Sequence, residues 1–459
     1  MMRVLEFIVA LIIVAVVGLV VGVVMPGSGH VERSLVIGKD MRQVYDILDN
    51  FRRFDDYSVL RQYDPKLQFK LSGKDYGPGA ELSWNSNDAK VGEGKLTIAS
   101  AEPEFFKVDN TVNDAKIVWN LDNGWRGQDK HFTLDLERQG SRHQLTKVTW
   151  SYDVAYGFNL VDRYSNLYIH GDPDAFIQFS LNNLQNVLAA VPNIDYGKLI
   201  PYMQPAKPTP VLLVSSQIDR KGGLAALDDA TATAVGQIQA AAKKLGVNVV
   251  GPRIIFTTNY GDQTYTFDVA MPIDATSLTV AGQSQQLTPP QAPKLGDEPA
   301  DASSAPAGAS STAAPAAGPA PGDHDRFGRL VVDANVRATL AFNEPALMGV
   351  WNGTAAGVPQ TRDMLKAYAQ THGYKFDEVT NRLYDIEVQP EAKDKTGAVT
   401  AYAKYQVYLP LIGDNVPAQT PEQAAGIPQP TLDVAPAASS SAPAAAGSSA
   451  APAAAASAQ

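Results

Sequence analysis

Cysteine is absent from all 459 residues of the chain. This absence excludes disulfide frameworks, thiolate zinc sites, iron–sulfur clusters and cysteine nucleophiles. A chain without thiols has nothing to be misoxidised, so it is suited to an oxidising envelope compartment.

Clustered positive charge is also lacking. The chain has 38 Lys and Arg against 48 Asp and Glu, for a formal net charge of −10. Proteins that bind nucleic acid present clustered Lys and Arg to the phosphate backbone. We therefore expect no nucleic-acid partner.

The recognisable catalytic motifs are missing. The sequence contains no Gly-x-Ser-x-Gly elbow, no His-Glu-x-x-His and no dinucleotide fingerprint. Acidic residues are numerous, but no spacing singles out a pair for acid–base chemistry. We predict no catalytic residue, no metal site and no cofactor.

One long apolar run lies near the N-terminus. From Phe7 to Met25 there are 19 residues without a polar side chain, which as a helix would cover roughly 28 Å, close to the thickness of a bilayer core. A cleaved signal peptide would have a shorter apolar region and an Ala-x-Ala-like site, and Val24-Met25-Pro26-Gly27 offers none. We predict an uncleaved transmembrane helix over residues 6–25, with the membrane as its partner.

The orientation follows from the charge on the short side of this run. Arg3 and the terminal amine precede it, and positive charge stays on the cytoplasmic side. No second apolar run of spanning length exists. The prediction is a single-pass protein of the inner (cytoplasmic) membrane, with its soluble domains periplasmic or extracytoplasmic.

Low-complexity segments divide the rest of the chain. Residues 302–322 and 435–458 contain almost only Ala, Pro, Ser and Gly, a composition that cannot bury enough apolar surface to offset chain entropy. We predict a disordered insertion at 288–325, a disordered tail at 413–459 and a proline-rich linker at 192–209. Two ordered blocks remain, 30–191 and 210–412.

The first block alternates strand-like runs with turn residues. An opening strand at 31–37 is followed by Asp40 as the N-cap of a short helix, and Asp172-Pro173 begins a closing helix. The spacing between them predicts an antiparallel meander. Its strands are expected at 67–71, 80–84, 95–99, 105–112, 116–121, 131–136 and 144–154.

This order resembles the helix-grip fold of the polyketide cyclase/START-like (SRPBCC) superfamily. The segments that carry the resemblance are Asp40…Val44, Asp49-Asn50-Phe51, Gly73…Gly77-x-Gly79…Trp84, Gly94-Lys95-Leu96-Thr97-Ile98 and Thr146-Lys147-Val148-Thr149-Trp150. The family commonly has a Trp after the second short helix, where this chain has Phe54-Asp55-Asp56-Tyr57. The resemblance implies an apolar cavity between sheet and last helix that binds lipids, hormones or polyketides.

Four aromatic residues on expected strands are candidates to line such a cavity: Trp84, Trp119, Trp150 and Tyr152. The alternative is that these side chains simply fill the core, because aromatic residues bury a large area wherever they lie.

The second block contains an internal repeat. Residues 267–273 match residues 405–411 as aromatic-x-Val-x-x-Pro-aliphatic, and expected helices at 224–245 and 360–372 stop at Gly246 and Gly373. Each half is predicted as strand, helix, strand, strand, and the halves are expected to pack as one domain. The strands are expected at 211–218, 253–260 and 264–271, then at 337–343, 381–388 and 400–409.

This pattern resembles the effector-binding domain of GyrI-like and AraC-type regulators, through Gly251-Pro252-Arg253 and the prolines Pro272 and Pro410. In that family a groove between the halves takes small cationic or apolar molecules, and a glutamate two residues before a tyrosine supplies negative charge. Here Arg382 stands at that position, two residues before Tyr384. The departure favours an anionic or neutral ligand. The candidate ligand-binding residues of this domain are Tyr260, Arg382 and Tyr384.

Asp385 and Glu387 lie close to this position but on the opposite strand face from Arg382 and Tyr384. They would restore the acidic charge only if that face were turned towards the groove. The alternative for Arg382 is a solvated strand charge without a role in recognition.

Taken together, the sequence predicts an α+β protein: a transmembrane helix, a helix-grip domain and a duplicated β-α-β-β domain. The favoured function is a membrane-anchored module that binds a small apolar or amphipathic ligand. The alternatives are a cyclase or hydrolase that uses one of the cavities, and a scaffold for envelope proteins. Protein partners cannot be read from the residues.

Overall fold

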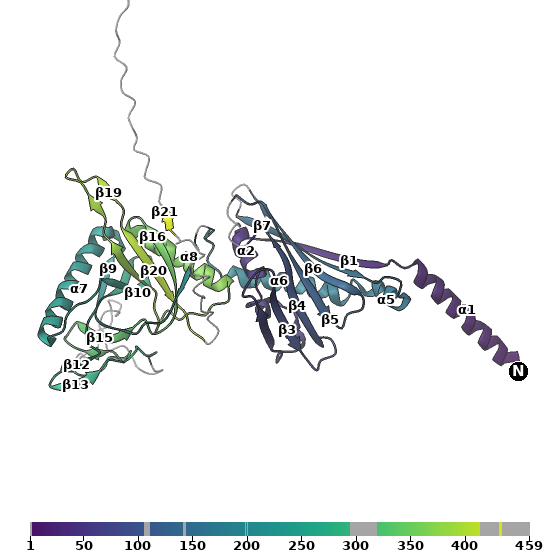
Figure 1. Cartoon of the computed structure of the whole chain (residues 1–459), viewed down its shortest axis with the longest axis horizontal. Coiled ribbons are helices and arrows are strands. Elements are labelled where there is room, and N and C mark those ends of the chain that lie inside the picture. The colour runs from purple at the N-terminus through teal and green to yellow at the C-terminus, as the bar shows by residue number, and fades with distance from the viewer. Residues whose placement is uncertain are drawn as a thin grey trace, which may run out of the picture.

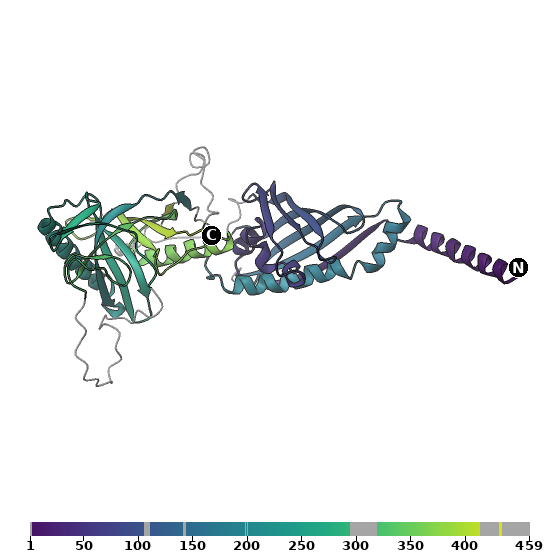
Figure 2. The same cartoon turned by 90° about the horizontal axis from the view of Figure 1, so that it is seen from below.

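The structure, a computed structural model, describes residues 2–104, 111–140, 144–197, 199, 201–293, 319–413 and 431–433. It is α+β: an N-terminal helix extends from a body built on two large, mainly antiparallel sheets (Figures 1 and 2). Most of the predicted insertion (294–318) and most of the predicted tail lie outside the described residues.

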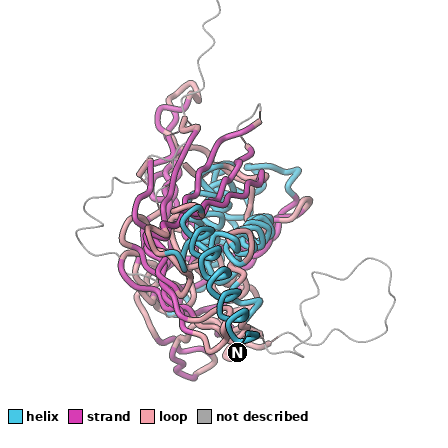
Figure 3. Tube along the Cα trace, turned by 90° about the vertical axis from the view of Figure 1, so that its right-hand side faces the viewer, coloured by secondary structure: helices cyan, strands magenta, loops and turns pink. Residues whose placement is uncertain are grey.

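Helix α1 (Met2–Val24) contains the apolar run. Its Val4–Val24 stretch is long and apolar enough to cross a membrane. Almost every side chain along it is exposed, because the helix leaves the body and meets it only near its C-terminal end (Figure 1). In the view from its own end, the helix stands in front of the sheets (Figure 3).

The first unit is a seven-stranded antiparallel sheet in the order β1-β7-β6-β5-β4-β3-β2, with the long helix α6 packed against it. A curved sheet holding one long C-terminal helix is a helix-grip arrangement. The strands are β1 (Ser28–Ile37), β2 (Phe69–Gly73), β3 (Ala80–Asn85), β4 (Glu93–Glu102), β5 (Asp114–Asn123), β6 (Gln128–Gln139) and β7 (Leu145–Ala155). The helices are α2 (Met41–Leu48), α3 (Phe54–Tyr57), α4 (Leu60–Tyr63), α5 (Leu160–Tyr164), the 3-10 turn η2 (Ser165–Tyr168) and α6 (Asp172–Ala189).

Local signals account for most of these boundaries. The Asp40 side chain accepts a 2.8 Å hydrogen bond from the backbone N–H of Arg42 and so caps α2 as predicted. Helix α6 begins with Asp172-Pro173, but Gly171 rather than Asp172 occupies the N-cap position. The strand expected at 105–112 lies mostly outside the described residues, and β5 begins at Asp114.

The second unit is a ten-stranded sheet whose order is β14-β15-β9-β11-β10-β17-β20-β16-β21, with β8 also paired to β16. Helix α7 (Gly223–Leu245) and helix α8 (Val358–Thr371) pack on it. Its longer strands are β9 (Thr209–Asp219), β10 (Ile254–Tyr260), β11 (Thr264–Pro272), β15 (Val336–Ala341), β16 (Ala346–Asn352), β17 (Tyr384–Gln389) and β20 (Lys404–Pro410). The shorter ones are β8 (Tyr202–Gln204), β12 (Ser277–Val280), β13 (Gln283–Gln286), β14 (Leu330–Val331), β18 (Ala392–Lys393), β19 (Val399–Ala401) and β21 (Thr431–Asp433), of which β12–β13 and β18–β19 form separate hairpins.

Both helices end where the glycines predict. Gly246 follows α7 with φ +70°, and Gly373 lies just beyond α8 with φ +71°, which are left-handed conformations that favour glycine. The strand expected at 337–343 corresponds to β15, but β15 pairs with β9 of the other half. The strand that directly precedes α8 is β16, which the pattern did not predict because five successive residues of it are buried and no alternation shows.

The segment predicted as a linker is packed rather than extended. Tyr196 and Leu199 are buried, and β8 adds to β16 of the second unit. Helix α2 of the first unit contacts α8 of the second, and one apolar cluster contains residues of both units. The two units therefore share a core, because α8 supplies apolar side chains to the same cluster as α2.

One piece of the predicted disordered tail forms secondary structure. Strand β21 pairs in parallel with β16 through Val350↔Thr431 and Asn352↔Asp433. The prediction failed here because an unpaired sheet edge offers backbone hydrogen bonds that composition does not register.

Candidate functional site

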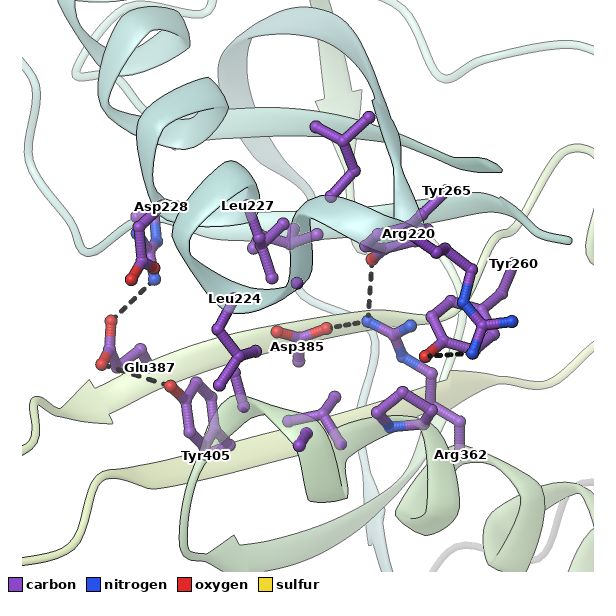
Figure 4. Close-up of a pocket in the computed structure, with 18 residues that line it drawn as sticks. Arg220, Leu224, Leu227, Asp228, Tyr260, Tyr265, Arg362, Asp385, Glu387 and Tyr405 are labelled. Carbon is purple, nitrogen blue, oxygen red and sulfur yellow. Dashed lines mark hydrogen bonds and ion pairs between the residues drawn. The ribbon is translucent and has the colours of Figure 1, made fainter. Parts of the chain in front are cut away.

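A pocket of about 350 Å³ lies between the two halves of the second unit, within the range of sites that enclose small ligands. The first turn of α7 and the first turn of α8 form two of its sides, and the sheet forms its floor (Figure 4). The floor residues belong to β10 and β11 of one half and to β17 and β20 of the other. Neither half alone encloses this space.

An ion pair lies at the base of the pocket. The Arg362 guanidinium, on α8, donates to the carboxylate of Asp385, on β17, and both side chains are more than 90% buried. Burial raises the pKa of Asp385, against the opposing effect of the Arg362 charge. Among the described residues Arg362 Nε has no hydrogen-bond partner. An unused buried donor is costly, so the ion pair at the base of the pocket is incompletely satisfied.

Aromatic rings make up one wall. The Tyr265 hydroxyl accepts a 3.4 Å hydrogen bond from Arg362 Nη2, and the Tyr260 ring packs edge-on against Tyr265 with centroids 5.1 Å apart. The Arg220 guanidinium lies over the Tyr260 ring at 4.3 Å, a cation–π contact. Leu224 and Leu227 of α7 face these rings across the pocket (Figure 4). The wall suits a flat apolar body.

A second ion pair closes the far side. Arg253 Nη2 and Glu387 Oε2 are 2.8 Å apart, and the Tyr405 hydroxyl donates to Glu387 over 3.4 Å. Burial raises the pKa of Tyr405, and the negative charge of Glu387 adds to this effect. With Asp228 at the rim, three carboxylates balance the three arginines that line the pocket. The site as a whole carries no net charge.

The predicted residues of this unit divide between two faces of the sheet. Tyr260 lines the pocket, whereas Arg382 and Tyr384 line a separate cavity of only about 50 Å³ on the other face. Arg382 Nη2 donates to Asp268 over 2.6 Å and Nη1 donates to Thr258 over 2.5 Å. The Arg382 guanidinium is therefore already paired with a buried carboxylate. A role for Arg382 in binding an anionic ligand stays a prediction.

Asp385 and Glu387 are the β17 residues that face the pocket. Their location on the face opposite Arg382 follows from strand alternation, as predicted. The sequence interpretation missed Arg220, Tyr265, Arg362 and Tyr405. No local signal marks them, because each reaches the pocket from a different element.

The aromatic residues predicted in the first unit lie in its interior. Trp119, Trp150 and Tyr152 are at most 1% exposed. Trp119 and Trp150 pack edge to face with centroids 5.3 Å apart, and Phe132 contacts both Trp150 and Tyr152. This packing is what the core-filling alternative describes. A ligand-binding role for the three stays a prediction.

Trp84 differs from these three residues. It lines a hollow of about 690 Å³ at one end of the sheet, together with Val91 and Trp125. Within the described part of the chain the indole N–H groups of Trp84, Trp119 and Trp150 have no acceptor. No group of three or more His, Asp or Glu side chains suited to a metal ion occurs among the described residues.

Comparisons with known proteins give structural similarity only. No protein-family model matches the chain, and no curated protein matches it. Solved structures that resemble it include a norcoclaurine synthase from Thalictrum flavum, with 13% identity over 36% of this chain and 96% of that one, at a TM-score of 0.26. The protein XoxI from Bacillus cereus shows 15% identity over 35% of this chain and 96% of that one, at a TM-score of 0.25.

Proposed function

We propose that the chain is a membrane-anchored binding protein whose second unit holds a small, uncharged amphipathic molecule between its two halves. The observation that carries this proposal is the pocket closed by α7 and α8, with aromatic walls and the Arg362–Asp385 ion pair at its base. Small-molecule sites typically combine apolar walls with a few convergent polar groups. No described residue set in the pocket offers a nucleophile activated by a neighbouring base, so binding is favoured over catalysis.

The chemistry of the ligand follows from the balance of charge. Each lining carboxylate of β17 is already paired with an arginine, Asp385 with Arg362 and Glu387 with Arg253. A charged ligand would have to compete with one of these pairs and lose its own hydration. A neutral polar head avoids that competition, while a flat apolar body contacts Tyr260 and Tyr265.

The assignment of the second unit to a GyrI-like effector-binding domain belongs to this proposal. It is supported by the order of elements, since β9-α7-β10-β11 and β16-α8-β17-β20 follow the same succession. The sheet order places β9-β11-β10 beside β17-β20-β16, as two related halves would. The SRPBCC assignment of the first unit is supported by its helix-grip arrangement.

Ligand binding is tested on the full chain in lipid nanodiscs with three probes that share a naphthalene body. These are naphthalenemethanol, naphthoate and naphthylmethylammonium, with neutral, anionic and cationic heads. We expect the neutral probe to bind tightest. Leu224→Trp should weaken it by at least about tenfold, or about 1.4 kcal/mol, because the larger side chain fills the pocket. Leu71→Trp, at a similarly exposed leucine of the first unit, is the control. Absence of binding, or equal binding by Leu224→Trp, would overturn the proposal.

The membrane anchor and its orientation are a second part of the proposal. They are supported by the length and composition of α1 and by Arg3 on its short side. Carbonate extraction should leave the full-length chain in the membrane fraction. A reporter fused after Gln459 that is active only outside the cytoplasm should be active. Release of a shortened chain into the soluble fraction would instead identify a signal peptide.

A further inference from the structure

An exposed apolar patch adjoins the N-terminal helix. Phe158 is 96% exposed, Tyr168 74%, Leu167 60% and Val161 59%. These four residues, here called the junction patch, belong to α5, η2 and the residues just before them. Four large apolar side chains exposed within eleven residues are unusual on a soluble surface and indicate a binding face.

The element that bears the patch packs on α1 itself. Gly18 is partly buried and Gly22 is buried, whereas every other residue from Val4 to Val24 is exposed. The Tyr164 hydroxyl donates to the Gly18 carbonyl. A Cβ at Gly22 would lie 3.2 Å from the Tyr164 ring and 3.3 Å from Leu160. The small-x-x-x-small face of α1, a common packing face of membrane helices, is thus occupied by α5.

Arg163 caps the same end of α1. Its Nη1 donates to the carbonyl of Val23 over 3.0 Å, and its Nε donates to the Gly157 carbonyl over 2.8 Å. A cation at the C-terminal end of a helix is favourable, and arginine at the end of a membrane span is typical of the lipid–water interface. The patch is therefore held at a defined depth relative to α1.

That depth follows from helix geometry. Gly18 lies six residues before the end of α1 at Val24, or about 9 Å along the axis. If α1 spans the bilayer, contacts at Gly18 and Gly22 place α5 beside the outermost part of the apolar span. The side chains of the junction patch then lie at headgroup depth.

We propose that residues 158–168 form an interfacial element that inserts the junction patch into the lipid leaflet surrounding the end of α1. The occupant of the patch is the bilayer, because the patch is continuous with the lipid-facing surface of α1 and mixes Phe and Tyr with aliphatic residues, as interfacial segments do. This inference rests on the proposed anchor. A second copy of the chain or another protein on the patch is the competing outcome.

One consequence concerns the hollow of the first unit. The strand register places Ser28, Ala155 and Gln128 at the same end of the sheet, next to α1. The turn that holds Trp125 lies at this end too, and Arg126 Nη1 reaches Asp162 of α5 over 3.4 Å. An inserted patch would therefore hold the hollow lined by Trp84 and Trp125 close to the bilayer surface.

The absence of cysteine makes a direct test possible, since any introduced thiol is the single labelling site. Leu167→Cys and Phe158→Cys are labelled with a nitrobenzoxadiazole fluorophore in the full chain. The proteins are reconstituted into phosphatidylcholine–phosphatidylglycerol vesicles with acyl chains brominated near the headgroup. We expect strong loss of emission relative to unbrominated vesicles. Leu145→Cys, at the opposite end of the same sheet and 40% exposed, should keep its emission.

The possible outcomes distinguish failure of the interfacial element from failure of the membrane anchor. Carbonate-resistant protein with quenching at 158 and 167 supports both. Carbonate-resistant protein without quenching at either position overturns the interfacial element and leaves the anchor standing. Extraction by carbonate overturns the anchor. Quenching that is lost at high protein density, with cross-linking between labelled chains, would assign the patch to a second copy. Since both labelled residues are exposed, neither substitution should impair folding.

Discussion

Asp268 of β11 and Arg382, just before β17, form a 2.6 Å ion pair that joins the two halves of the second unit. The Asp268 carboxylate is 2% exposed and also accepts hydrogen bonds from Arg329 Nη1 at 3.0 Å and from Ser215 Oγ at 2.7 Å. Burial alone would raise its pKa, but the charges of Arg382 and Arg329 hold the pKa below its ordinary value. Arg382 therefore has a structural partner.

Arg382→Glu should lower the free energy of unfolding by about 3–5 kcal/mol, because it leaves a buried carboxylate beside a second negative charge. It should not change the charge preference of the pocket, which lies on the other face of the sheet. The measurement is urea unfolding of the full chain, with Lys116→Glu on the exposed face of β5 as the control. A reversal of ligand preference at unchanged stability would contradict this assignment. The stabilisation by Asp268 should be lost as the pH falls below about 4.

Asp49 should make the protein less stable as the pH rises. It is 1% exposed, neither carboxylate oxygen has a hydrogen-bond partner among the described residues, and burial raises its pKa to about 8, with the charge of Asp46 adding to the effect. Between about pH 4 and 8 the folded state holds a proton that the unfolded state releases. The free energy of unfolding therefore falls by about 1.4 kcal/mol for each pH unit across this range.

Asp49→Asn removes this titration. The variant and the parent should have similar free energies of unfolding near pH 4. Above that pH, the free energy of unfolding of the variant should rise relative to that of the parent by about 1.4 kcal/mol per pH unit, up to about pH 8. Unfolding free energies measured across this range decide the matter. Asp75→Asn, at a half-exposed carboxylate paired with Arg52, is the matched control substitution. A constant difference between Asp49→Asn and the parent at all pH values would refute the prediction.

Leu365 of α8 should couple the stability of the two units. It is fully buried in the cluster that contains residues of both, so Leu365→Ala should cost about 2–5 kcal/mol. Four of the five tryptophans lie in the first unit, so tryptophan fluorescence reports mainly on that unit. We expect the unfolding midpoint reported by tryptophan fluorescence to shift together with the midpoint reported by far-UV circular dichroism. Ile238→Ala, in the separate cluster under α7, is the comparison. A first unit that unfolds unchanged in Leu365→Ala would show that the units are independent.

Gly22→Leu should separate α5 from α1, because the new side chain meets Tyr164 and Leu160. Val21→Leu places the same side chain at an exposed neighbouring position, without this contact. The readout is the protection of Arg163 and Tyr164 amides from hydrogen exchange in nanodiscs. We expect protection to fall in Gly22→Leu alone. Equal protection in both variants would mean that α5 does not depend on the glycine face.

Features that depend on local chemistry could be predicted from the sequence. The apolar run needs only length and composition, and the resulting helix α1 matches it closely. Gly246 and Gly373 end α7 and α8 because a left-handed backbone conformation is a property of the residue itself. Asp40 caps α2 because its short side chain accepts a hydrogen bond from a backbone N–H two residues along the chain. The meander of the first unit follows from alternation between turn residues.

Features that depend on contacts between distant residues could not be predicted from the sequence. Strand β16 has no alternating pattern because it is buried on both faces, and β15 was placed in the wrong half because its partner β9 lies more than a hundred residues away. The pocket joins Arg362 of a helix to Asp385 of a strand and to Tyr265 of the other half. The sequence alone determined that Asp385 and Glu387 share one strand face. The packing of the two halves alone decided which strand face borders the pocket. It also decided that Asp268 neutralises Arg382, because electrostatic partners are set by distance in space.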